Sequence, residues 1–145
     1  MATPSSEREP DADLGDLVLR VARGLRQRGA AVTAPWDLAP HQARALRVVA
    51  RHGQVRPGRI AAHLRVAPRS VTDVTDALEE RGLVERAPDA DDRRATVVTL
   101  TASGRRLVDE IDEARRGDLS SFFSQLSERD QATLRRILTT LDATD

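Results

Sequence analysis

Cysteine and lysine are both absent from the 145 residues, so all 23 basic side chains are arginines. Without cysteine, the chain can form neither disulfides nor thiolate metal sites, and thiol-based redox sensing is excluded. No stretch approaches the roughly 20 consecutive apolar residues of a membrane span. The first residues do not resemble a signal peptide. These absences predict a cytoplasmic protein without a membrane partner.

Catalytic signatures are missing as well. The sequence has no Gly-rich phosphate-binding loop, no Gly-x-Ser-x-Gly elbow and no cysteine nucleophile. The tripeptide Ala102-Ser103-Gly104 resembles an active-site serine only in isolation, because it begins a predicted helix. We therefore predict neither an enzyme nor a cofactor.

Charge is balanced over the whole chain but uneven along it. The formal net charge is zero, which by itself argues against a nucleic-acid partner. However, residues 41–106 contain thirteen arginines and eight acidic residues, whereas residues 1–40 and 107–145 carry a net negative charge. A basic middle between acidic ends indicates a local surface for a polyanion.

Apolar spacing predicts a mobile tail over residues 1–13 and a single domain over residues 14–145. A first amphipathic helix begins at Leu14 and is expected to break between Gly29 and Pro35. Proline suits the first position of a helix, so a second helix is predicted from Pro40 to Gly53.

Two short helices follow with a tight connection. One begins at Pro57 and the next at Pro68, with only residues 64–67 between them, which favours a helix-turn-helix. On the second of these helices, a 100° projection separates an apolar face from an opposite polar face. The apolar face holds Val71, Val74, Thr75 and Leu78, and the polar face holds Arg69, Asp73, Asp76 and Glu80.

Two β-prone runs, residues 83–87 and 95–100, flank a charged loop and predict a hairpin directly after the helix-turn-helix. Such a hairpin is a wing. Thr101 can cap a fifth helix, and Ser127-Glu128-Arg129-Asp130 resembles the capping box of a sixth. The predicted fold is mainly α, with six helices and one small β-hairpin wing.

This order of elements, and the string VTDVTDALEERGLVERAPDADDRRATVVTLTASGRRL, resembles the MarR (multiple antibiotic resistance regulator) family. The resemblance covers residues 14–145. It implies a winged helix-turn-helix over residues 38–105, with dimerisation helices over residues 14–36 and 106–145 that build a triangular homodimer. It also implies a repressor that a small-molecule effector releases from double-stranded DNA with a pseudo-palindromic operator.

The resemblance places the fourth helix in the major groove and the wing in the minor groove. Arg69, Ser70 and Thr72 would then contact bases or phosphates, the wing arginines would enter a narrow groove, and Asp92 would orient Arg94. Two residues depart from the family pattern. Ala67 replaces the usual Ser or Thr cap, and Asp73 replaces a basic or neutral residue. The complete predicted DNA-binding set is Pro68, Arg69, Ser70, Thr72, Asp73, Arg86, Asp92, Arg93 and Arg94.

Asp73 cannot bind phosphate, but it could accept a hydrogen bond from cytosine N4 or pair with Arg69 four residues earlier. Trp36 and His41 could line an effector pocket, with a packing role for Trp36 as the alternative. No metal site is predicted, because His41, His52 and His63 are eleven residues apart on different helices.

The main alternative function is a winged-helix protein–protein interaction module that has lost DNA binding. The basic middle of the chain argues against it, because seven arginines and no carboxylate lie between Asp37 and Asp73. An interaction module would have little reason to keep that bias. The sequence therefore favours a DNA-binding transcription regulator.

Overall fold

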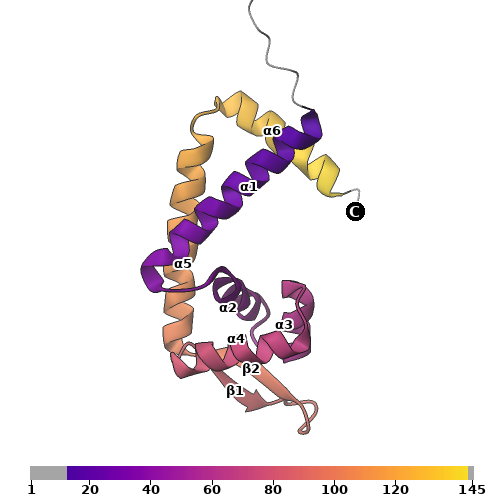
Figure 1. Ribbon diagram of the computed structural model, residues 1–145, viewed down its shortest axis with the longest axis vertical. Helices are drawn as coiled ribbons and strands as arrows, with labels where there is room; N and C mark the ends of the chain where they lie inside the picture. The colour runs from indigo at the N-terminus through magenta and orange to yellow at the C-terminus, as the bar shows by residue number, and fades with distance from the viewer. Residues whose placement is uncertain (1–12, 144–145) are drawn as a thin grey trace, which may run out of the picture.

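Six α-helices, one 3₁₀ helix and one β-hairpin make up residues 13–143, the part of the chain that the computed structural model describes (Figure 1). The predicted fold class is thus confirmed, while the predicted tail lies outside the described residues except for Asp13. In chain order, the elements are α1 (Leu14–Thr33), η1 (Ala34–Trp36), α2 (Pro40–His52), α3 (Pro57–Leu64), α4 (Pro68–Glu80), β1 (Val84–Pro88), β2 (Thr96–Leu100), α5 (Ala102–Phe123) and α6 (Glu128–Asp142).

Helix α1 is longer than the sequence predicts. It continues through Gly29 to Thr33 instead of breaking there. A single glycine inside a helix costs only about 1 kcal/mol relative to alanine, and the alanines that follow favour the helical state. Pro35 then lies in the first turn of η1, where its missing N–H is not needed.

The predicted helix starts are confirmed. Pro40, Pro57 and Pro68 each occupy the beginning of a helix. The side chain of Thr101 accepts a hydrogen bond from the Gly104 N–H at 3.0 Å and so caps α5. Ser127 caps α6 in the same way, as its hydroxyl accepts from the Asp130 N–H at 3.2 Å.

The structure has two regions that share α5 (Figure 1). We call the lower region, α2 to β2 with the first half of α5, the winged lobe. We call the upper region, α1, the second half of α5 and α6, the arm. The continuous buried core belongs to the winged lobe, and its larger members include Leu46, Val49, Ile60, Val71, Leu78, Val98 and Ile111. No residue of α6 is buried.

A tight joint connects the hairpin to both neighbours. Strands β1 and β2 pair antiparallel, and Val55, just before α3, forms a further bridge to Val98 of β2. Gly104 of α5 packs so closely on the α4–β1 turn that a Cβ there would lie 1.9 Å from the Leu83 carbonyl oxygen. The Thr101 N–H donates to that same oxygen at 3.1 Å. The wing therefore has a fixed attachment to α5.

Candidate nucleic-acid interface

Helix α4 presents its two predicted faces as expected. Its apolar side, Val71, Val74, Thr75 and Leu78, is buried in the winged lobe. Its predicted polar side, Arg69, Asp73, Asp76 and Glu80, is exposed to solvent. The prediction from helical projection is confirmed, so α4 offers a polar surface supported by a rigid core.

The start of α4 lacks a side-chain cap, as the alanine at position 67 predicts. Ala67 adopts extended backbone, and no side-chain hydrogen bond satisfies the first turn. The Ser70 N–H donates to the Ala67 carbonyl at 3.0 Å. Before it, Arg65 adopts a left-handed conformation with φ 56°, which allows α3 to turn into α4 within three residues. The two helices are thus held at the short spacing of a helix-turn-helix.

Asp73 and Arg69 are both exposed, and no hydrogen bond or ion pair between them is found among residues 13–143. The possible i, i+4 pair is thus not formed in this state. Asp73 instead borders a hollow of about 430 Å³ between α2 and α4. Ser70 and His41 line the same hollow.

Arg86 connects the wing to α4. From β1 its guanidinium donates to the Thr75 hydroxyl at 2.7 Å and to the Asp76 carboxylate at 2.5 Å, and it also forms an ion pair with Glu79. Burial lowers the pKa of Arg86, but its two carboxylate partners outweigh burial and raise it overall. Arg86 was predicted among the DNA-binding residues, and the structure gives its side chain three partners within the protein.

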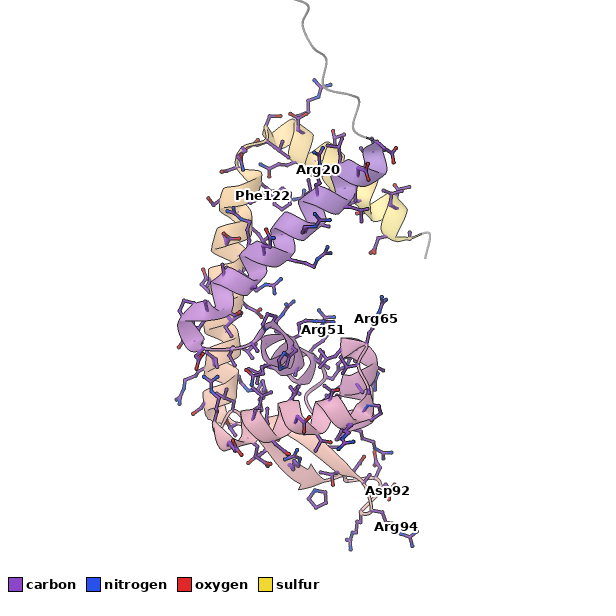
Figure 2. All side chains as sticks on the ribbon, in the orientation of Figure 1. Arg20, Arg51, Arg65, Asp92, Arg94 and Phe122 are labelled. Carbon is purple, nitrogen blue, oxygen red and sulfur yellow. The ribbon has the colours of Figure 1, made fainter. Side chains whose placement is uncertain are left out.

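Asp92 and Arg94 lie at the tip of the hairpin, away from the body of the molecule (Figure 2). Arg93 and Arg94 are exposed. The Asp92 carboxylate accepts a hydrogen bond from the Arg94 backbone N–H at 3.1 Å, and the Asp92 carbonyl accepts from the Ala95 N–H at 2.8 Å. Asp92 therefore shapes the turn that carries Arg94, through the backbone and not through the guanidinium.

The base of the wing contains an ion pair that sequence reasoning missed. Arg56, which precedes α3, lies with its Nε 2.6 Å from Asp89 Oδ2. These two residues are 33 positions apart, and no local spacing rule connects them. The pairing of Val55 with β2 brings Arg56 beside the loop.

Comparisons with known proteins agree with this geometry. A family model described as the MarR family matches residues 38–96. The HTH-type transcriptional regulator Mb0904 of Mycobacterium bovis is 35% identical over 124 residues, which cover 86% of this chain and 84% of that protein. The chain belongs to the MarR family. Like its relatives in the family, it is a helix-turn-helix transcription regulator that binds DNA.

Solved MarR structures share the fold over almost the whole chain. A MarR family protein from Bacillus stearothermophilus superimposes with a TM-score of 0.83 at 26% identity, covering 91% of this chain and 92% of that one. A mutant of Staphylococcus aureus MepR bound to an oligodeoxyribonucleotide has a TM-score of 0.67 at 24% identity, covering 92% and 99%. The winged helix-turn-helix assignment is thereby confirmed.

In this MarR chain, Trp36 is held by packing and hydrogen bonds. Its indole N–H donates to Glu110 at 3.1 Å, and Arg81 donates to the backbone carbonyls of Trp36 and Asp37, both at 2.7 Å. Trp36 also packs against the core of the winged lobe. The hollow beside His41 does not include Trp36 in its lining. The two predicted effector residues therefore do not share that hollow.

Two of the three histidines come together, although their spacing gave no sign of it. The rings of His52 and His63 have centroids 4.9 Å apart. Desolvation, followed by the charge of Arg59, lowers the pKa of His52. Across residues 13–143, no group of three or more His, Asp or Glu side chains is placed to hold a metal ion. In the same range, no helix has the length and apolar character needed to cross a membrane.

Proposed function

We propose that this regulator reads its operator with α4 in the major groove and the wing in the adjacent minor groove. The observation that carries this proposal is that α4, with exposed Arg69, Ser70 and Thr72, packs beside a hairpin whose tip carries Arg94. Arg93 precedes Arg94 in the same loop. Base edges are read from the first turns of a recognition helix, and arginines favour a narrow minor groove. The DNA-bound MepR mutant has the same fold.

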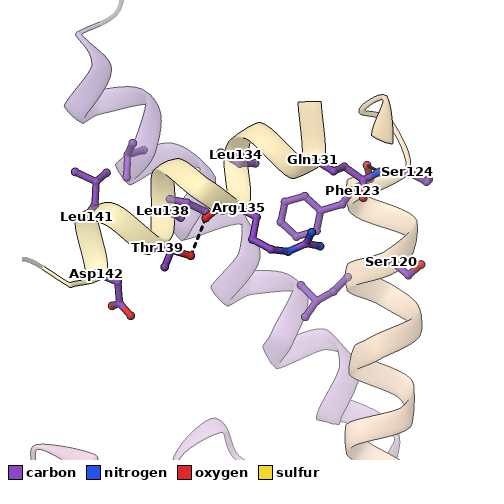
Figure 3. A pocket seen from close by; sticks show the side chains of 12 residues that line it. Ser120, Phe123, Ser124, Gln131, Leu134, Arg135, Leu138, Thr139, Leu141 and Asp142 are labelled. Carbon is purple, nitrogen blue, oxygen red and sulfur yellow. Dashed lines mark hydrogen bonds between the residues drawn. The ribbon is translucent and has the colours of Figure 1, made fainter. Parts of the chain in front are cut away.

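A homodimer is the second part of the proposal. A groove of about 1090 Å³ opens between α1, α5 and α6, and apolar residues such as Phe123, Leu134 and Leu138 line it (Figure 3). Exposed apolar side chains continue along α1, where Leu14 is 75% exposed. A contiguous exposed apolar surface of this kind marks an interaction site. We assign it to a second copy of the chain, with residues 14–36 and 106–145 as dimerisation helices.

The winged helix-turn-helix, residues 38–105, would then appear twice around one two-fold axis. Such a dimer presents its recognition helices to successive major grooves, so the operator should be pseudo-palindromic with half-sites about 10 bp apart. Repression released by a small-molecule effector completes the proposal, and we place the protein in the cytoplasm with its DNA target. His41 lines a hollow bordered by α4 and is the better placed of the two effector candidates.

The test compares Arg69 with Arg94, because replacing each arginine should change DNA binding in a different way. Arg94→Ala should weaken binding to most sequences and reduce the salt dependence by about one ion per subunit. Arg69→Ala should instead relax discrimination at one half-site position by about 1–3 kcal/mol, with a smaller change in non-specific affinity. Titrations against one operator and its single-base variants, at several salt concentrations, measure both effects.

The Asp73→Ala variant extends the same experiment. If Asp73 pairs with Arg69 when DNA is bound, the loss of base discrimination in the double variant should be smaller than the sum of the losses in the two single variants. An Arg69→Ala protein that keeps its base preference and changes only in salt dependence would make Arg69 a phosphate contact. Failure of the unmodified protein to bind any DNA would favour the interaction-module alternative.

A further inference from the structure

The wing is attached to the start of α3 through two neighbouring residues. The Val55 N–H donates to the Val98 carbonyl at 3.1 Å, and the Val98 N–H donates back at 2.8 Å, so the backbone of Val55 holds β2. The side chain of Arg56 binds Asp89, which immediately follows β1. These two neighbouring residues therefore contact β2 and the residue that follows β1.

Arg56 is itself fixed by α3. It occupies the N-cap position in extended backbone, and its carbonyl accepts from the Arg59 and Ile60 N–H groups at 2.9 and 3.3 Å. Its backbone position is thus set by the first helix of the helix-turn-helix. Its contact with Asp89 therefore links the wing loop to that helix.

Asp89 makes three contacts at the base of the wing loop. Its N–H donates to the Ala95 carbonyl at 3.0 Å, one carboxylate oxygen accepts from the Asp91 N–H at 2.9 Å, and the other accepts from Arg56. The Asp91 N–H, followed by Arg56, lowers the pKa of Asp89. The Asp89 side chain is only 12% exposed, against 52% for Arg56. Asp89 is thus the ordered centre of this loop.

A carboxylate here is unexpected under the proposed function, because phosphates repel negative charge. The wing loop carries three acidic residues, Asp89, Asp91 and Asp92, beside its two arginines. Asp92 shapes the turn that carries Arg94, and Asp89 holds the loop to Arg56. The negative charge of Asp89 therefore serves a contact within the protein.

We propose that Arg56 and Asp89 form a latch that fixes the angle of the wing to the helix-turn-helix and thereby positions Arg93 and Arg94 for the minor groove. Arg56 is a positioning residue in this proposal, not a DNA contact. The inference rests on the proposed function, since it assumes that the wing enters DNA. Together with Arg86, which ties β1 to α4, the latch attaches the wing to both helices of the helix-turn-helix.

The competing role for Arg56 is direct phosphate binding, and the Asp89→Asn variant separates the two by the sign of its effect. Asparagine keeps an oxygen for the Asp91 N–H but removes the charge that holds Arg56. If Arg56 positions the wing, its release should weaken operator binding by roughly two- to five-fold, as expected for one exposed ion pair. If Arg56 instead clamps a phosphate, its release and the lost negative charge should tighten binding.

Asp91→Asn is the matched control. It removes the same charge from the same loop, whereas its carboxylate has no hydrogen-bond partner within residues 13–143. This variant should bind DNA slightly more tightly, because one repulsive charge is lost. Arg56→Gln should weaken binding in either case, so it tests whether the position matters but not how it acts.

The experiment measures operator affinity of the full-length protein and its three variants, with amide hydrogen exchange of residues 89–95 in the free protein. We expect weaker binding and faster exchange in Asp89→Asn and Arg56→Gln. In Asp91→Asn we expect slightly tighter binding and unchanged exchange. Unchanged or tighter binding by Asp89→Asn overturns the latch. Absence of operator binding by the unmodified protein would instead overturn the proposed function, and the exchange data would still report whether the latch orders the loop.

Discussion

The winged lobe and the arm differ in how they bury apolar surface. In the lobe, residues such as Leu46 and Ile60 are completely buried within one chain. In the arm, Leu138 and Leu141 remain 47% and 61% exposed, and α6 buries no residue at all. The lobe thus completes its core alone, whereas the arm has an apolar surface that a second chain can cover. Under the proposed function, this difference separates the region that reads DNA from the region that forms the dimer.

The largest expected effect compares one leucine from each region. Leu46→Ala should destabilise the protein by about 2–5 kcal/mol, because it leaves a cavity in a closed core. Leu138→Ala should change the stability of a single chain far less, since that side chain is half exposed. Urea unfolding at two protein concentrations tests the contrast. The Leu46→Ala loss should not depend on concentration, whereas any Leu138→Ala loss should shrink on dilution, because both proteins then lose the stabilising partner chain; equal behaviour would remove the distinction between the regions.

The next effect concerns α5, the helix that both regions share. Gly104→Ala should cost about 1–3 kcal/mol by overpacking, because the new Cβ meets the Leu83 carbonyl and must displace backbone. Gly117→Ala, in the arm half of the same helix, meets nothing within 4 Å. It should stabilise the helix by about 0.5–1 kcal/mol. Thermal denaturation should show a lower melting temperature for Gly104→Ala and a higher one for Gly117→Ala. An unchanged melting temperature for Gly104→Ala would show that the backbone at Leu83 can shift to accept a Cβ.

Ion pairs should also differ between the regions. Arg86→Gln in the lobe removes charged contacts to Asp76 and Glu79 and one to buried Thr75. We expect a loss of about 1–2 kcal/mol, discounted for the exposure of the carboxylates. Arg116→Gln in the arm removes a single exposed pair with Glu113 and should leave the stability unchanged. Equal changes in the free energy of unfolding would contradict the role of Arg86 in connecting the wing to α4.

The smallest effect is a pH dependence within the lobe. The pKa of His52 is lowered in the folded protein, so the unfolded chain binds more protons as the pH falls below about 6.5. Stability should therefore rise with pH between the folded-state pKa and about 6.5, and His52→Gln should flatten this slope. His41→Gln, outside the His52–His63 ring pair, is the control. Unfolding curves from pH 5 to 8 measure the slope, and an identical slope in His52→Gln would refute the assignment.

Local signals in the sequence predicted most of the fold. The prolines at 40, 57 and 68 mark helix starts, Thr101 and Ser127 mark caps, and these interactions act within one turn of the chain. The predicted end of α1 was wrong. A single glycine inside a helix costs little, and the neighbouring residues favour the helical state, so α1 continues through Gly29.

The candidate site was predictable in part for the same reason. Helical periodicity fixes which side chains of α4 share a face, so Arg69 and Asp73 could be placed opposite the buried Val71 without coordinates. Periodicity does not show what a long side chain binds. Arg86 was predicted at DNA, and the structure adds its contacts with Thr75, Asp76 and Glu79, which no periodicity indicated.

By itself, the sequence determined the order of the helices, the wing, the exposed face of α4 and the basic middle of the chain, because each depends on residues close together in the chain. Only the tertiary structure decided which distant residues meet. The Arg56–Asp89 pair, the His52–His63 pair and the contact of Gly104 with Leu83 all depend on how β2 and α5 pack against the lobe. Packing of that kind is a property of the whole core, which no short spacing in the sequence encodes.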